Sequence, residues 1–254
     1  MSVPAYVTVD AAMPLPGLRV AFVQGLPSPW SVAVRAIFEF KGLTYTAVAQ
    51  HAGEANEALR KWTGQCSAPV AMYGTERPRS LWSELLLLAE RLAPDPPLIP
   101  DCPEDRALMF GLCQEIGGED GLGWSIRALL LAEKVAAGDS PASHLLARYS
   151  SGMSIAHSRQ RLNGVISLLA RRLVSQQEQS SDYLVGHTLS AADIYWVSFS
   201  NMVRTMLRAD CVMPDFYLEL GDLSRAYLDS PLPEILIEHR DRILHRHFVL
   251  PIEF

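Results

Sequence analysis

A proline-rich segment, Ala93–Pro100, divides this 254-residue chain into two parts that differ in hydrophobic periodicity. Before the segment, short apolar runs bounded by glycine and proline alternate with amphipathic stretches, whereas only helical spacing follows it. We therefore expect an α/β domain over residues 18–92 and an all-α domain over residues 104–254, with the proline-rich segment as their linker. Residues 1–17, which contain three prolines, are predicted to be an irregular extension.

The element order in the first domain is strand–helix–strand–helix–strand–strand–helix. The strands are expected at residues 18–23, 45–49, 69–73 and 80–82. The helices are expected from Pro29 to a stop at Gly42, at 54–62, and at 84–92 with Ser83 as its cap. In the second domain, helices are predicted at 104–116, 125–136, 156–176, 191–207, 218–228 and 232–246.

The overall charge and the cysteines narrow the class of protein. A net charge of −6 and an isoelectric point near 5.6 disfavour binding to nucleic acid or to anionic membranes, which requires a basic surface. No cysteine spacing indicates a zinc site, so the four cysteines are expected to be free thiols in a reducing compartment. The sequence lacks an apolar run long enough to span a membrane and shows no signal-peptide pattern, so we expect a cytoplasmic protein.

The segment Gly186–Ile194 carries the most specific local pattern. Ser190 stands at the N-cap of a predicted helix and Asp193 three residues later, as in a capping box. Leu189 and Ile194 occupy the two positions of a hydrophobic staple. The pattern predicts a helix start that serves folding and takes no part in chemistry.

A second helix start, at Ser28-Pro29-Trp30-Ser31, has a chemical use as well as a structural one. The first N–H groups of a helix and its dipole stabilise an anion such as a thiolate. Ser28 is placed to donate a hydrogen bond to such an anion. A serine before proline at a helix start is also an ordinary cap, so both interpretations stay open.

These marks, together with Ala68-Pro69-Val70, resemble the layout of the cytosolic glutathione transferases, in a serine-type form of no assigned class. The resemblance implies a thioredoxin-like N-terminal domain, an all-α C-terminal domain and a homodimer. It also implies that glutathione is the co-substrate and that its thiolate attacks a small electrophile. Two alternatives share the same marks, namely a non-catalytic binding module of this fold and a glutathione-dependent isomerase or dehalogenase.

The same resemblance implies roles for particular residues. Ser28, which stands seven positions before Arg35, would activate the thiol, and Ser31, one turn further into the helix, is the alternative. Ala68 and a cis Pro69 would present backbone groups to the cysteinyl part of glutathione. The remaining expected contacts in this region are Trp30, Gln65 and Ser67.

The γ-glutamyl end is expected at the start of the next helix, where the family carries an acidic residue followed by serine. Here the order is reversed, Ser83-Glu84, and the pair also fits a plain helix cap followed by a first-turn acid.

The acceptor pocket is expected beside the first helices of the second domain. Trp124 could stack a hydrophobic electrophile and Arg127 could hold an acidic one, although residues of both kinds are more often structural. No metal site is predicted. His239 is expected to face solvent or to make local contacts.

Overall fold

A computed structural model describes residues 5–138, 140–149 and 154–254. Its contacts divide the chain into two compact units. The first unit contains the chain through Pro96 and two later segments, Leu207–Met213 and Phe248–Phe254. The second contains Pro97–Met206 and Pro214–His247. The linear boundaries expected from the sequence, 18–92 and 104–254, remain a prediction.

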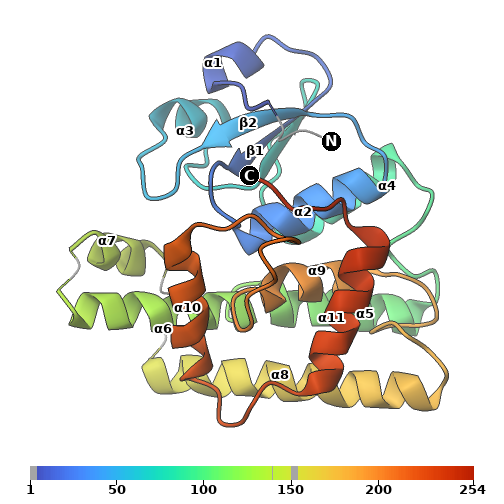
Figure 1. Ribbon diagram of the computed structural model, residues 1–254. Helices are drawn as coiled ribbons and strands as arrows, with labels where there is room; N and C mark the ends of the chain where they lie inside the picture. The colour runs from blue at the N-terminus through green and yellow to red at the C-terminus, as the bar shows by residue number, and fades with distance from the viewer. Residues whose placement is uncertain (1–4, 139, 150–153) are drawn as a thin grey trace. The chain divides into compact units, whose positions relative to one another are not determined.

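The first unit is built on a three-stranded sheet of order β2-β1-β3 (Figure 1). The strands are β1 (Leu18–Val23), β2 (Thr46–Gln50) and β3 (Val70–Tyr73). The helices that follow them are α2 (Pro29–Phe40), α3 (Glu57–Thr63) and α4 (Trp82–Leu92). β1 pairs in parallel with β2 and antiparallel with β3. All six residues of β1 are buried, as the short, mostly apolar run at residues 18–23 predicts.

The predicted fourth strand at 80–82 is wrong. Only one bridge forms there, between Ala71 and Arg79, through two backbone hydrogen bonds of 2.8 and 3.0 Å. The chain then enters α4 at Trp82, with Leu81 rather than Ser83 at the N-cap. The physical reason is the short connection, because only Ser80 and Leu81 lie between the bridge at Arg79 and the first residue of α4, which leaves no length for a strand.

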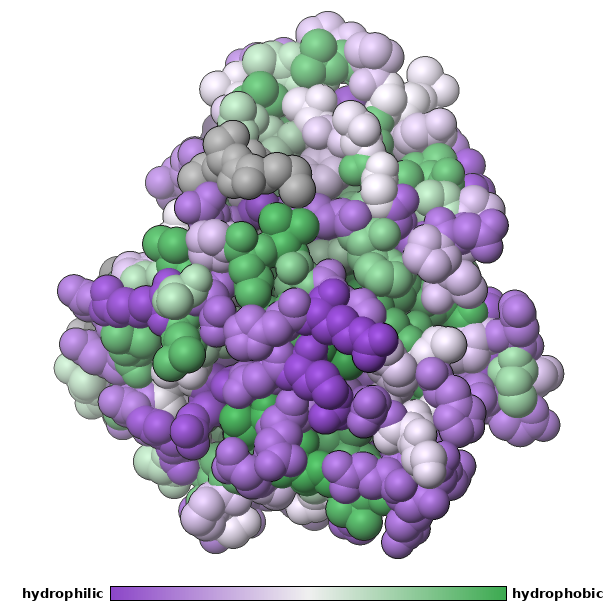
Figure 2. Space-filling model, turned by 45° about the vertical axis from the view of Figure 1, so that its right-hand side comes forward, coloured by the Kyte–Doolittle hydropathy of each residue, from purple (hydrophilic) through white to green (hydrophobic). Residues whose placement is uncertain are grey.

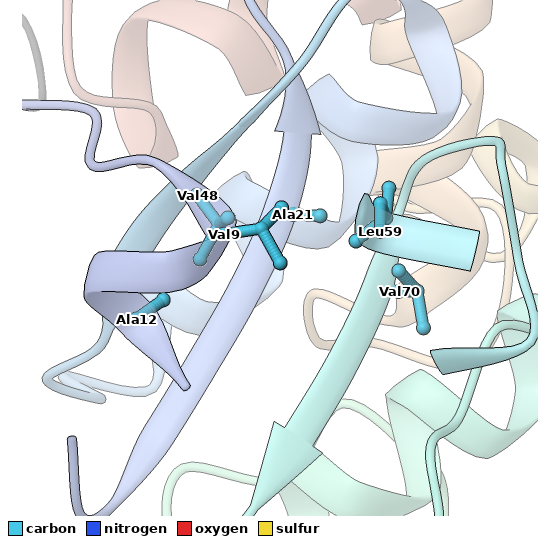
Figure 3. Packing of buried hydrophobic residues seen from close by; sticks show 6 residues of the cluster. All are labelled: Val9, Ala12, Ala21, Val48, Leu59 and Val70. Atoms are coloured by element: carbon cyan, nitrogen blue, oxygen red, sulfur yellow. The ribbon is translucent and has the colours of Figure 1, made fainter. Parts of the chain in front are cut away.

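The expectation of an irregular N-terminal extension is also wrong for the described residues. Val7 pairs with β2, donating to Ala47 O (2.9 Å) and accepting from Ala49 N (3.0 Å). A short helix, α1 (Val9–Ala12), follows. Its buried residues join a cluster that also contains Ala21, Val48, Leu59 and Val70 (Figure 3). This segment covers the edge of β2, which would otherwise leave strand backbone groups and apolar side chains exposed.

In the second unit, the regular secondary structure of the described residues is all helical. Its helices are α5 (Pro103–Gly117), α6 (Leu122–Ala136), α7 (Ser140–Tyr149), α8 (Ile155–Glu178), α9 (Ala191–Ser200), α10 (Asp215–Arg225) and α11 (Glu234–His247). The sequence did not predict α7. α9 ends seven residues earlier than expected, because the chain leaves it for the segment that belongs to the first unit.

The capping box at the start of α9 forms as predicted and is extended by a histidine. The fully buried Asp193 carboxylate accepts hydrogen bonds from Ser190 N (2.9 Å), Ser190 Oγ (2.9 Å) and Leu184 N (2.8 Å). His239 Nε2 lies 2.9 Å from the same carboxylate. His239 is only 1% exposed, so it makes a buried local contact and does not face solvent. The box therefore joins α9 to α11 as well as starting α9.

The two late segments of the first unit are paired with each other and with α2. Val212 N donates to Ile252 O (3.0 Å), and Ile252 N donates to Asp210 O (2.8 Å). The Arg35 guanidinium donates to Glu253 O and forms an ion pair with Glu39 of its own helix at 2.7 Å. In this structure Arg35 therefore anchors the last residues of the chain to α2.

Candidate functional site

The tip of α2 presents a serine hydroxyl that the helix does not use. Ser28 is the N-cap residue by backbone geometry, with φ −61° and ψ 117°, and Val32 N donates to its carbonyl (2.9 Å) to close the first turn. In the described part of the chain, its side chain makes no capping hydrogen bond. Pro29 occupies the first helical position. The hydroxyl of the half-buried Ser28 is thus available to a ligand, which an ordinary serine cap would not be.

Ser31 has a different environment. It is 4% exposed, and its Oγ accepts a hydrogen bond from Val23 N at 3.2 Å. Val23 is the last residue of β1, so Ser31 ties the end of that strand to the first turn of α2. Its hydroxyl lies inside the unit, where it supports the helix tip.

The loop before β3 contains the cis peptide bond between Ala68 and Pro69 that the resemblance implied. Gln65 is exposed, Ser67 and Ala68 are half-buried, and Pro69 is buried. Within the described structure, no backbone-to-backbone hydrogen bond engages Ala68. The backbone of Ala68 therefore remains available for pairing with an extended peptide.

The sheet register brings this loop and the tip of α2 to the same edge. Ala21 of β1 lies opposite Val70 of β3, so the end of β1 and the start of β3 share one side of the sheet. Arg79 pairs back onto Ala71, and the chain from Arg79 returns toward that side before α4 begins. Three features separated in sequence, at Ser28, Pro69 and Ser83, are thereby directed to one edge.

An ion pair links the first turn of α4 to the turn that precedes it. Ser83 is half-buried within the first turn, and Glu84 Oε1 lies 2.6 Å from Arg77 Nη2. The hydrogen bond from Arg77 holds the pKa of the Glu84 carboxyl below its ordinary value. Glu84 is therefore an anion at neutral pH, and the sequence did not single out its partner Arg77. The two lie seven residues apart, on a turn and a helix, so no periodic pattern connects them.

In the second unit, Arg127 lies against two aromatic rings. Its Cζ is 4.4 Å from the ring centroid of Trp124 and 4.2 Å from that of Tyr149, and the two rings are 6.3 Å apart at 75°. Burial lowers the pKa of Arg127 to about 10. A partly desolvated guanidinium attracts an anion more strongly than one in water does. Tyr149 was missed because it lies on the unpredicted helix α7.

The described residues hold no group of three or more histidine, cysteine or acidic side chains that could bind a metal ion. None of the described helices is both long and apolar enough to cross a membrane.

On the face shown in Figure 2, hydrophilic residues lie among hydrophobic ones. The described cysteines are free thiols, and Cys66 is half-buried beside the cis-proline loop.

Comparison with known proteins identifies the fold. No family model and no curated protein sequence matches this chain. Among solved structures, a glutathione transferase family member from Pseudomonas fluorescens with two glutathione bound aligns over 95% of each chain, with a TM-score of 0.63 and 14% identity. A glutathione S-transferase from Methylobacterium radiotolerans, in complex with glutathione sulfonate, aligns over 87% of this chain and 93% of its own, with a TM-score of 0.55 and 20% identity.

A third similar structure is a glutathione S-transferase from Methylobacillus flagellatus with glutathione bound, which covers 90% of this chain and 95% of its own at a TM-score of 0.61 and 14% identity. These similarities show the fold, and this chain has the glutathione-transferase fold. The predicted fold class, a thioredoxin-like domain followed by an all-α domain, is confirmed.

Proposed function

We propose that this protein is a glutathione transferase that uses Ser28 to activate the glutathione thiol. The observation that carries the proposal is the Ser28 hydroxyl at the tip of α2, which no capping bond uses and which shares a sheet edge with the cis-proline loop. A hydrogen bond from Ser28 and the N-terminal dipole of α2 both favour the thiolate over the thiol. The thiolate sulfur then forms a bond to an electrophilic carbon, and the leaving group departs with its electron pair.

The rest of glutathione fits the same edge. The backbone of Ala68 pairs with the cysteinyl residue, while Gln65, Ser67 and Trp30 line its neighbourhood. Glu84 attracts the γ-glutamyl ammonium, and the Ser83 hydroxyl and the N-terminal N–H groups of α4 donate hydrogen bonds to its carboxylate. The glutathione carried by similar structures supports this assignment. The protein works in the cytoplasm as a homodimer, as the resemblance implied.

A non-catalytic binding module of the same fold is the second candidate. One observation favours it, because the Glu84 carboxylate is already paired with Arg77 and a ligand ammonium must compete for it. The available hydroxyl of Ser28 favours the enzyme. A glutathione-dependent isomerase or dehalogenase would use the same thiolate and differ only in its second substrate.

Glutathione should bind this protein with a micromolar to millimolar dissociation constant, because the helix tip and the loop at Pro69 supply most of its contacts. At a ligand concentration of about ten times the dissociation constant, the expected stabilisation is about 1.4 kcal/mol. Calorimetry and thermal unfolding measure the two effects. If about 10 mM glutathione produces no heat and no shift in melting temperature, glutathione is not the ligand.

Arg127 should select acceptor substrates that carry an acidic group. We expect Arg127→Met to raise KM for 4-chloro-3-nitrobenzoate roughly tenfold, since a charge-assisted hydrogen bond is lost. The uncharged 4-chloro-3-nitrobenzamide provides the matched control, and its KM should stay within about twofold of wild type. Equal losses for the acid and the amide would assign Arg127 to packing between Trp124 and Tyr149.

A further inference from the structure

Gln50, the last residue of β2, is hydrogen-bonded to both loops that we propose bind glutathione. Its carbonyl accepts from Gln24 N at 2.9 Å, in the loop that leads from β1 to Ser28. Its side-chain Nε2 donates to Cys66 O at 3.1 Å, in the loop that ends at the cis Pro69. These two loops lie more than 35 residues apart in the sequence, and this one residue connects them.

The geometry requires the amide of Gln50 in particular. Nε2 also donates to His51 O at 3.0 Å, so each of its hydrogens meets a carbonyl and the orientation of the amide is determined. The same His51 carbonyl accepts from Asn56 at 2.7 Å, and Asn56 precedes the first turn of α3. The Gln50 side chain therefore joins β2, the start of α3 and the loop that follows α3.

The buried amide of Gln50 is only partly hydrogen-bonded. Gln50 is 4% exposed, and its Oε1 is buried without a hydrogen-bond partner among the described residues. An unsatisfied buried acceptor destabilises a fold, so this atom reduces what the two donated bonds to His51 and Cys66 contribute. The clear structural consequence of the amide is therefore the connection that its Nε2 makes to those two carbonyls.

We infer that Gln50 is a positioning residue, which holds the Gln24–Ser28 loop and the Cys66–Pro69 loop at the spacing that glutathione needs. The inference rests on the proposed function for its ligand. When the side-chain amide is removed, the loop at Cys66 loses its bond to β2, while the backbone bond between Gln24 and Gln50 remains. Binding must then include the free energy of ordering the Cys66–Pro69 loop against the Gln24–Ser28 loop. Gln50 touches neither the thiol nor the acceptor, so the effect falls on ligand affinity and loop mobility.

The test compares Gln50→Leu with wild type, using S-methylglutathione as the probe because it has no thiol to ionise. The dissociation constant should rise at least tenfold, and amide hydrogen exchange should accelerate in residues 64–68 but not at Gln24, whose N–H donates to the Gln50 backbone carbonyl. Gln50→Glu, which has the same shape but no donor when ionised, should behave like the leucine variant. Kd is measured by calorimetry and exchange by mass spectrometry.

Lys41→Met is the matched control. Lys41 Nζ is also buried in the first unit, where it bonds Pro94 O (3.0 Å), Pro96 O (2.8 Å) and Glu90 (2.7 Å). This variant should lower the melting temperature while leaving affinity and exchange in the two loops unchanged. The inference is overturned if Gln50→Leu binds and exchanges like wild type, or if Lys41→Met weakens binding equally. If the wild type binds no S-methylglutathione or glutathione but Gln50→Leu accelerates exchange in residues 64–68, the positioning role of Gln50 is supported and the proposed function fails.

Discussion

Asp193→Ala should destabilise the protein by about 3–5 kcal/mol, which approaches the whole stability of many domains. The Asp193 carboxylate is fully buried and accepts four hydrogen bonds, from Leu184 N, Ser190 N, Ser190 Oγ and His239 Nε2. Truncation leaves these donors buried without an acceptor, and each unsatisfied donor lowers the stability by about 1–3 kcal/mol. These losses do not simply add, because the donors share one acceptor group. Chemical denaturation followed by circular dichroism measures the loss.

Ser198→Ala provides the control for this prediction. Ser198 is also buried in α9, but its hydroxyl bonds only to Ile194 O of its own helix at 2.8 Å. Its removal should change the free energy of unfolding by about 1 kcal/mol or less. Asp193→Asn keeps one acceptor oxygen and should fall between the two. An Asp193→Ala protein within about 1 kcal/mol of wild type would show that the buried box is not a centre of stability.

Ser28→Ala should reduce turnover by roughly ten- to a thousandfold, while the fold and most of the glutathione affinity are retained. The Ser28 hydroxyl makes no capping bond, so its loss leaves the helix start unchanged. Without that donor, the bound thiol should ionise at higher pH, and each pKa unit corresponds to about 1.4 kcal/mol. Ultraviolet absorbance of the bound thiolate against pH, together with kcat, measures both effects.

The Ser31→Ala variant tests whether Ser31 activates the thiol or only stabilises the fold. Ser31 Oγ accepts from Val23 N inside the unit, so the alanine variant should lose about 1–3 kcal/mol of stability with little change in the thiol pKa. The reverse result, with turnover lost in Ser31→Ala and kept in Ser28→Ala, would assign activation to Ser31. If neither variant alters turnover, backbone N–H groups alone hold the thiolate or the protein is not a transferase.

Local patterns in the sequence predicted the features that depend on a few neighbouring residues. The capping box of α9 and the helix start after Ser28 require only residues within one turn. A short apolar run predicted β1, and helical spacing predicted six of the helices in the second unit. Glutathione binding, by contrast, was inferred from resemblance and not from a local pattern.

The remaining site residues could not be predicted because their partners are distant in sequence. Gln50 meets Cys66 only after β2 and the loop before β3 have been placed, and nothing in either segment marks the contact. Arg77 pairs with Glu84 across a turn, and Arg127 contacts Tyr149 on α7, a helix that the sequence did not predict.

By itself, the sequence determined the two kinds of secondary structure, the helix starts and the candidate thiol-activating serines, because propensity, capping and periodicity act over a few residues. Only the tertiary structure decided that the Ser28 hydroxyl makes no capping bond while the Ser31 hydroxyl is buried. It also decided that His239 bonds the Asp193 carboxylate of the capping box and that Glu253 is bonded by Arg35 of α2. These outcomes depend on which distant groups compete for the same hydrogen-bond donors and acceptors, and that competition begins only when the elements pack together.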